Sequence, residues 1–292
     1  MSNVAPLDHT SRPRGLWRGR LFLGFLLFSL AVGIVTLVAL ILEVVSNGAR
    51  WFDLVLLLEP PSADPQIAGA RPAILATIYI GVLLLAFTVP LGVGTAIYME
   101  EYASKERWYN RLLELNIQNL AAVPAIVYGI LGLAFVVRGP VGVGRVLLAG
   151  AIILTLVVLP TVIIASREAI RAVPDSIRQG GFALGATKWQ VVSRQVLPAA
   201  IPGIATGSIL ALSRAVGETA PLLLIGALQY VAFDPTVLGA FTALPVQIYT
   251  WVKLPDPAFQ TLAAAAIIVL LVIVLSMNAV AIFLRNRYRQ TW

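Results

Sequence analysis

The chain has 292 residues, of which 59% are apolar and only 12% are charged, and its formal net charge is +7. This composition excludes a disordered chain and is too apolar for an ordinary soluble domain, so lipid is expected to surround much of the chain. An excess of Lys and Arg in such a chain is typical of cytoplasmic loops, so no nucleic-acid partner is predicted. Because cysteine is absent and His9 is the only histidine, the sequence argues against disulfides, a zinc site and histidine-based catalysis.

Six apolar segments are long enough to cross a bilayer as helices. A helix rises about 1.5 Å per residue, so about 20 residues cross a hydrocarbon core of about 30 Å. Five of the segments contain no charged residue, and the remaining one contains Arg214 and Glu218. The segments are residues 21–42, 73–99, 115–137, 146–166, 203–226 and 257–284. We therefore predict an all-α integral membrane protein with six transmembrane helices.

The distribution of basic residues predicts the orientation. With the N-terminus inside, 15 of the 21 Lys and Arg residues lie in cytoplasmic segments and five lie in outer loops. Short cytoplasmic loops are enriched in Lys and Arg, so both termini are predicted to be cytoplasmic. Residues 1–20 and 285–292 are then cytoplasmic tails, residues 21–45 hold the first transmembrane helix, and residues 73–284 hold the other five. The first apolar stretch is too long for a cleaved signal peptide, so we expect it to be retained.

Residues 100–114 connect the second and third predicted helices and carry charges of both signs. The charged residues are Glu100, Glu101, Lys105, Glu106, Arg107, Arg111 and Glu114. Such a mixed run is typical of a solvated loop, which is the expectation for this connection. A secondary contact with a cytoplasmic partner is the alternative.

The loop at about residues 167–199 is the longest cytoplasmic segment and is too apolar for a flexible linker. Asp175 is a good N-cap for a first short helix, and Gly185 can end that helix in the left-handed conformation. Thr187 can cap a second short helix, which Pro198 is expected to stop. The pattern predicts a helix–turn–helix at the membrane surface. It is interpreted as a docking element for a cytoplasmic partner, and an interfacial amphipathic helix pair is the alternative.

Two consecutive glycines stand inside the first of these short helices. Gly180 and Gly181 each cost the helix about 1 kcal/mol relative to alanine, which favours a position where another surface comes close to the backbone.

Residues 179–186 resemble the "EAA loop" of ABC importer permeases, whose pattern is roughly E-A-A-x-x-L-G-A followed by a hydrophobic residue, Leu-Pro and a further Pro-Gly-Ile. Gln179 stands where that family usually has glutamate, and the two glycines stand where it has alanines.

This resemblance implies a coupling helix that sits in a groove of a separate ATPase subunit. The coupling residues that it implies are Gln179, Gly180, Gly181, Phe182, Ala183, Leu184, Gly185 and Ala186. The chain contains no Gly-Lys-Ser or Gly-Lys-Thr triplet, so it lacks the P-loop that would let it bind ATP itself. ATP and magnesium are therefore expected on the partner ATPase. This chain is expected to carry no cofactor or metal, to have no catalytic residue and not to be an enzyme.

Arg214 and Glu218 lie near the middle of the fifth predicted helix, where a charged residue costs about 2.5–3.5 kcal/mol on insertion scales. At spacing i and i+4 the two side chains share one helix face and can pair. A guanidinium matches the oxygens of phosphate or carboxylate and stays protonated, which favours an anion path in which Glu218 moderates the field. Thr219 adds a hydroxyl beside the pair. A self-neutralising bridge that only braces helix packing is the alternative.

Residues 213–222 read Ser-Arg-Ala-Val-Gly-Glu-Thr-Ala-Pro-Leu and resemble the R-A-x-G-E-T-A-P-L signature of phosphate-specific permeases. Residues 98–103 and 116–129 are similar to two further segments of that family. Residues 241–249 and the tail at 284–288 resemble its A-type subunit in particular.

The resemblance implies a type I ABC importer permease fold, with the coupling helix between the fourth and fifth transmembrane helices. It further implies a subunit of the high-affinity phosphate importer of the bacterial cytoplasmic (inner) membrane. The implied partners are a second homologous permease forming a heterodimer, a homodimeric cytoplasmic ATPase and an extracytoplasmic phosphate-binding protein. In that family the arginine and glutamate of the signature belong to the translocation path, which assigns Arg214 and Glu218. A permease for another oxyanion such as sulfate, or a secondary anion transporter, is the alternative.

Overall fold

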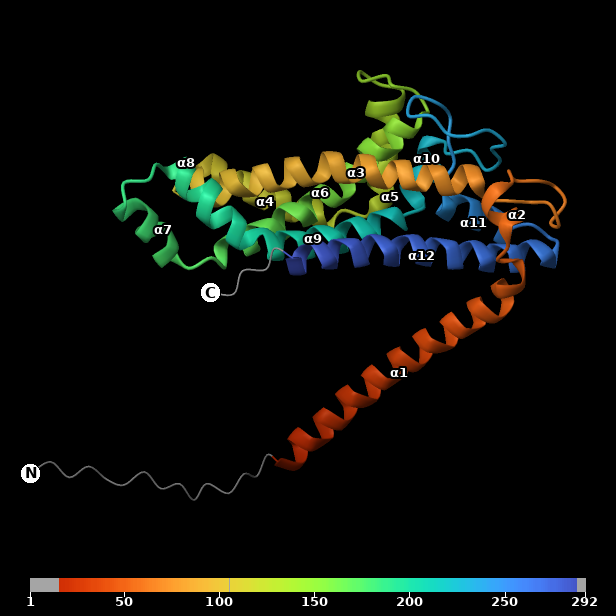
Figure 1. Ribbon diagram of the computed structural model, residues 1–292, viewed down its shortest axis with the longest axis horizontal. Coiled ribbons are helices and arrows are strands. Elements are labelled where there is room, and N and C mark those ends of the chain that lie inside the picture. The colour runs from red at the N-terminus through yellow and green to blue at the C-terminus, as the bar shows by residue number, and fades with distance from the viewer. Residues whose placement is uncertain (1–15, 105, 288–292) are drawn as a thin grey trace, which may run out of the picture.

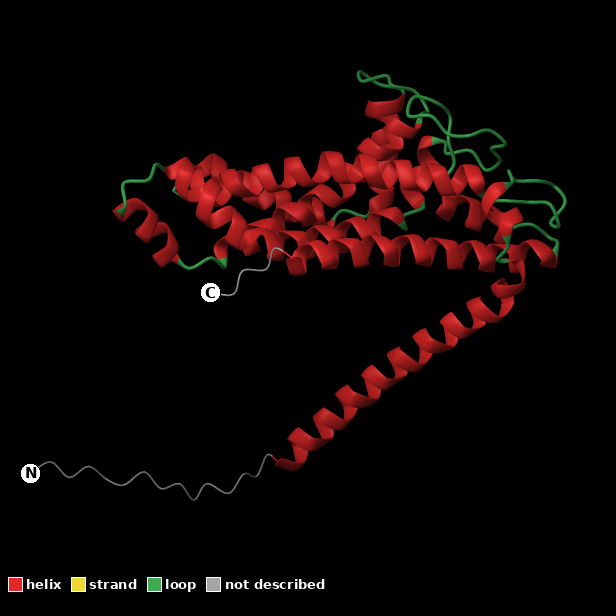
Figure 2. Cartoon of the chain, viewed as in Figure 1, coloured by secondary structure: helices red, strands yellow, loops and turns green. Residues whose placement is uncertain are grey.

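The computed structural model describes residues 16–104 and 106–287. Within these residues the chain consists of helices and connecting loops and contains no strand (Figure 2). The longer helices are α1 (Leu16–Gly48), α3 (Arg71–Ile97), α4 (Trp108–Ala122), α6 (Leu147–Arg171), α9 (Leu197–Val216) and α12 (Pro257–Arg287). The shorter ones are α2 (Leu54–Leu58), α5 (Ala125–Gly132), α7 (Asp175–Ala183), α8 (Lys188–Val191), α10 (Ala220–Ile225) and α11 (Leu244–Val252). A 3-10 turn, η1 (Ala49–Trp51), follows α1, and three π-helical turns are η2 (Tyr98–Tyr102), η3 (Leu133–Val137) and η4 (Val192–Val196).

Five of the described helical stretches are long and apolar enough to cross a membrane, and six are reached when one bent pair is counted as a single span. The prediction of an all-helical membrane protein is therefore confirmed. The third predicted span is not the continuous helix expected over residues 115–137, because α4 and the helix formed by α5 and η3 meet at 102°. Val123 and Pro124 both have non-helical backbone angles at this corner. The proline ring disfavours the helical conformation for the residue before it, and proline has no N–H to continue the helix.

The fifth span also differs from its predicted bounds of residues 203–226. Helical residues run without interruption from Lys188 to Val216 through α8, η4 and α9, so Pro198 does not stop the helix. The π-helical turn η4 stands directly before the first turn of α9, which contains Pro198, and such turns accommodate missing donors in apolar helices. The helix ends earlier than predicted, at Val216 with Gly217 as its C-cap, and the chain restarts as α10.

α3, α6, α9 and α12 pack side by side into an elongated bundle (Figure 1). Small residues allow the helices to approach closely, as is typical of membrane helix interfaces. A Cβ atom added at Gly207 of α9 would lie 2.3 Å from the Cβ of Ala165 on α6, and one added at Gly203 would lie 2.7 Å from that of Ala169. The centre of the bundle is a cluster of buried apolar side chains from α3, α6, α9 and α10, which includes Leu84, Leu154, Leu212 and Leu222.

α1 is longer than the predicted span of residues 21–45 and slants away from the bundle (Figure 1). It contacts the bundle through its C-terminal end, where the backbone of Gly48 lies against Ala264 and Ala265 of α12. The most apolar window of α1 is covered by no other part of the described chain. An apolar helix with no partner in its own chain must be covered by lipid or by another subunit.

Candidate translocation and coupling sites

Arg214 and Glu218 form an ion pair, with 3.5 Å between Nε and Oε1. Arg214 lies in the last turn of α9, whereas Glu218 lies beyond the end of that helix, between α9 and α10. The pairing expected from their spacing is therefore present, although the two residues do not share a continuous helix. The Arg214 side chain is 81% exposed and the Glu218 side chain is 22% exposed, so the chain leaves the guanidinium uncovered.

The backbone at this site is a break in a membrane helix. The amides of Gly217 and Glu218 bond back to the carbonyls of Arg214 and Ala215, and Thr219 then occupies the N-cap position of α10. The Thr219 hydroxyl makes no capping hydrogen bond there and is partly buried. Non-helical backbone at membrane depth is tolerated where it lines a cavity or is buried in protein. A guanidinium that the chain leaves uncovered at such a break needs a polar surrounding from outside the chain.

The predicted helix–turn–helix of the loop at residues 167–199 is confirmed as α7 followed by α8. Gly185 has a φ of +77° and ends α7 in the left-handed conformation. Thr187 caps α8 in a capping box: its hydroxyl accepts from the amide of Gln190, and the Gln190 side chain accepts from the amide of Thr187. Asp175 is the first residue of α7 rather than its N-cap, because Pro174 takes the N-cap position.

The two consecutive glycines of α7 have different surroundings. A Cβ atom at Gly181 would lie 2.8 Å from Cγ2 of Val191 and 2.9 Å from Oε1 of Gln195, so this glycine lets α8 and η4 of the same chain pack against α7. The corresponding position at Gly180 meets nothing within 4 Å. Of the two, Gly180 is therefore the one that keeps its backbone open to an outside surface.

The outer surface of α7 and α8 carries apolar side chains that the chain itself does not cover. Leu184 is 87% exposed, and Phe182 and Trp189 are also exposed. Among the other predicted coupling residues, Gln179, Ala183 and Gly185 are exposed, Ala186 is partly buried and Gly181 is buried. An exposed apolar knob next to a rim of charged residues is typical of a docking surface.

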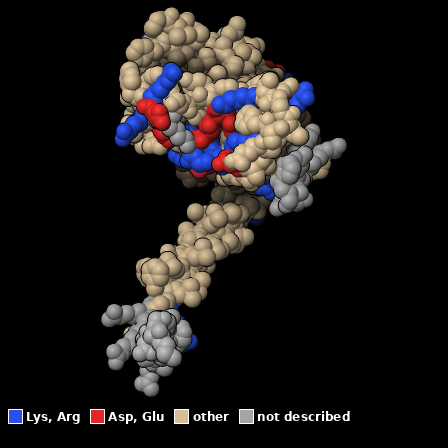
Figure 3. Space-filling view, turned by 90° about the vertical axis from the view of Figure 1, so that its left-hand side faces the viewer, with Lys and Arg blue, Asp and Glu red and all other residues tan. Residues whose placement is uncertain are grey.

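Charged side chains gather at the end of the bundle that carries α7 and α8, which is called the α7–α8 end below (Figure 3). Glu100 accepts from Nε of Arg167 and from Nη2 of Arg171, each at 2.8 Å. The next residue, Glu101, accepts from Nη2 of Arg178 at 2.9 Å. The Glu100 and Glu101 side chains are 6% and 9% exposed. The expectation of a solvated loop at residues 100–114 is therefore wrong for these two carboxylates, which η2 holds inside the packed structure.

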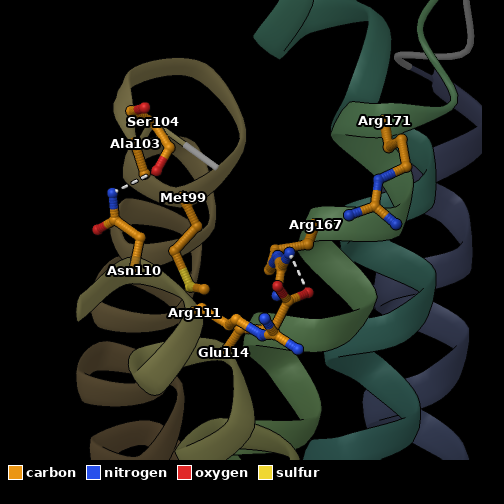
Figure 4. A pocket seen from close by; sticks show the side chains of 8 residues that line it. All are labelled: Met99, Ala103, Ser104, Asn110, Arg111, Glu114, Arg167 and Arg171. Atoms are coloured by element: carbon orange, nitrogen blue, oxygen red, sulfur yellow. Dashed lines mark hydrogen bonds and ion pairs between the residues drawn. The ribbon is translucent and has the colours of Figure 1, made fainter. Parts of the chain in front are cut away.

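A cavity of about 590 Å³ lies beside this network, between α4 and α6 (Figure 4). Glu114 of α4 accepts from Nη2 of Arg167 at 2.9 Å, while Asn110 donates to the carbonyl of Ser104 and fixes the start of α4. Sequence reasoning missed the network because its members are far apart along the chain. One signal was available: two adjacent acids end one apolar segment, and Arg167 and Arg171 end another at a spacing of one helix turn.

Comparison with known proteins identifies the class of the chain. Residues 88–290 match the model of the family described as "Binding-protein-dependent transport system inner membrane component". The chain belongs to this family of transport permeases. Two relatives carry the name phosphate transport system permease protein. PstA 1 of Mycobacterium tuberculosis (strain CDC 1551 / Oshkosh) is 31% identical over 89% of this chain and 86% of its own length. PstA of Yersinia pestis is 32% identical over 99% of this chain and 98% of its own length.

Solved structures confirm the permease fold. A bacterial ABC transporter involved in the import of the acidic polysaccharide alginate superimposes with a TM-score of 0.66, at 18% identity over 95% of this chain and 99% of its own. The methionine ABC transporter MetNI in an inward-facing conformation gives a TM-score of 0.59, at 20% identity over 76% of this chain and 95% of its own. The prediction of a type I ABC importer permease in the inner membrane is thus confirmed.

Proposed function

We propose that the chain is the A-type permease subunit of an ATP-driven importer of inorganic phosphate. Its similarity to permeases named for phosphate transport extends over almost the whole chain. The observation that carries the proposal is the uncovered guanidinium of Arg214 at a break in a membrane helix, because a charged group there is costly unless it serves a polar path. Its planar fork of donors matches the oxygens of phosphate, and Glu218, 3.5 Å away, keeps the site weak enough to release the ion.

In this proposal the α7–α8 end faces the cytoplasm and both termini lie on that side, in agreement with the positive-inside rule. A homodimeric ATPase docks on the exposed side chains around Leu184 and Gly180 and binds the ATP and magnesium. A second, homologous permease covers the face with Arg214, so each subunit forms half of the path. A phosphate-binding protein delivers the ion at the opposite end.

The structure suggests how docking can reach the path. The uninterrupted helix from Lys188 to Val216 contains 29 residues and is about 43 Å long at 1.5 Å per residue. It begins in α8, directly after the docking surface, and ends two residues beyond Arg214. When ATP brings the two ATPase subunits together, movement of α8 would shift this helix along its length. This shift would expose Arg214 alternately to the outer side and to the inner side of the membrane.

Transport by the reconstituted complex tests the proposal. Vesicles that contain the chain with its second permease, ATPase and phosphate-loaded binding protein should take up radiolabelled phosphate only when ATP is supplied inside. Excess arsenate should compete with phosphate, and excess sulfate should not. Competition by sulfate without competition by arsenate would favour the other oxyanion. Uptake by the chain without an ATPase would favour a secondary transporter instead.

A further inference from the structure

The π-helical turn η2 at the end of α3 holds two adjacent carboxylates that contact different helices. Glu100 pairs with Arg167 and Arg171, which both belong to α6. Glu101 pairs with Arg178, which belongs to α7. Consecutive residues of this turn therefore tie α3 to α6 on one side and to the docking helix α7 on the other.

The guanidinium of Arg178 is fully engaged. It donates from Nε and Nη2 to Oε1 of Glu101, at 3.1 and 2.9 Å. It also donates to the carbonyls of Val173 and Ile170, at 2.6 and 3.0 Å, and so joins α7 to the last turn of α6. Its remaining acidic contact, Asp175, is an exposed neighbour on α7 itself. Glu101 is thus the one acid in this set that links Arg178 to α3.

A second contact joins η2 to α8. The ammonium of Lys188, the first residue of α8, lies 4.9 Å from the centre of the Tyr102 ring, within the range of a cation–π interaction. α7 and α8 are themselves packed together through Gly181 and Val191. One turn of π-helix therefore contacts both halves of the docking element, and its stronger contact is the largely covered pair of Glu101 and Arg178.

From this arrangement we propose that Glu101 and Arg178 are positioning residues that couple the ATPase to transport: they clamp α7 to α3, so that a movement of the docked helix reaches α3 as well as α9. This inference rests on the proposed function, since it assumes that the α7–α8 surface receives an ATPase. It assigns the two carboxylates different roles. Glu100 stabilises the bundle, and Glu101 transmits motion. A merely structural pair would change stability without changing the ratio between stimulated and basal ATP hydrolysis.

The test uses Glu101→Gln in the complete complex of both permeases and the ATPase, reconstituted in lipid. The variant should co-purify with the ATPase and keep basal hydrolysis, while stimulation of hydrolysis by the phosphate-loaded binding protein should fall about tenfold, the range of an ordinary coupling free energy. Glu101→Asp should recover part of the stimulation. Arg178→Gln should match Glu101→Gln, and the double variant should be no worse than either single one, because both remove the same contact.

Two matched variants serve as controls. Glu106→Gln removes an exposed acid of the same connection and should leave stimulation unchanged, and Tyr102→Phe should do the same because it keeps the ring. Stimulation at the wild-type level in Glu101→Gln would overturn the inference, as would loss of the ATPase from that variant, since the pair would then be structural.

Hydrogen exchange provides a second readout that needs no substrate. In the same complex without the binding protein, Glu101→Gln should speed exchange of the amides of α7 and leave those of α6 unchanged. Unchanged exchange in α7 would refute the clamp. If the wild-type complex showed no response to phosphate while α7 loosened as expected, the proposed substrate would be wrong and the clamp would stand.

Discussion

Arg167 donates from Nε to Oε1 of Glu100 at 2.8 Å and thereby joins α6 to the π-helical end of α3, although the two residues are 67 positions apart in the chain. Both side chains are nearly covered, and Arg171 contacts the same carboxylate. A buried ion pair contributes little net stability, but removing one partner leaves an uncompensated charge. Replacing one of the two residues is therefore expected to lower the stability of the bundle, although the intact pair adds little to it.

Glu100→Gln should destabilise the bundle by about 3 kcal/mol, because it leaves the buried Arg167 with only the partly exposed Glu114 as a partner. Thermal unfolding of the purified complex measures this effect. Glu106→Gln, which removes an exposed carboxylate, should unfold like the wild type. Equal unfolding temperatures for the two variants would show that the Glu100 contacts do not hold the helices.

Arg214→Gln should lower phosphate uptake at least tenfold while the complex still assembles. The variant loses a charge-assisted hydrogen bond to the ion of about 1.5–3 kcal/mol, and each 1.4 kcal/mol is a factor of about ten. Arg214→Lys keeps the charge but loses the planar fork, so it should retain part of the activity. Uptake assays and co-purification are measured on the same preparations. Loss of assembly with Arg214→Gln would instead support a bridge between Arg214 and Glu218 that only braces the helices.

Gly185→Trp should release the ATPase from the complex. A side chain at a φ of +77° strains the backbone by about 1–2 kcal/mol, and the indole would project from the exposed turn between α7 and α8. Co-purification of the ATPase measures docking directly. Leu184→Asp is a second test, since it places a charge on the most exposed apolar side chain of the turn without straining the backbone. ATPase retained and coupled in both variants would place the docking surface elsewhere.

Gly180→Ala and Gly181→Ala should differ in the isolated permease, although the residues are neighbours on one helix. Alanine at Gly180 meets open space and should stabilise α7 by up to about 1 kcal/mol. Alanine at Gly181 would collide with Val191 and should loosen α7 from α8. Hydrogen exchange of α7 measures both effects. Weaker ATPase binding by Gly180→Ala, despite its stabler helix, would indicate that the partner approaches the backbone there. Similar exchange for the two variants would contradict the packing described for Gly181.

The sequence was sufficient for the features that depend on local chemistry. Long apolar windows predict membrane helices because the cost of placing charges in lipid allows few exceptions, and Arg214 and Glu218 stand out for the same reason. Gly185 predicts the end of α7 and Thr187 predicts the start of α8, since a positive φ and a capping hydroxyl are properties of single residues. The motif around Arg214 was enough to indicate the family.

Only the tertiary structure decided where the helices break and which charges meet. Pro198 lies inside a continuous helix whereas Pro124 stands at a sharp corner, because the effect of a missing N–H depends on what the neighbouring turns and helices supply. Glu101 and Arg178 are 77 residues apart, and their contact exists only because the folded bundle brings η2 beside α7. Periodicity and composition describe a residue and its near neighbours, so they can mark charged residues at the ends of apolar segments but cannot decide which of them pair.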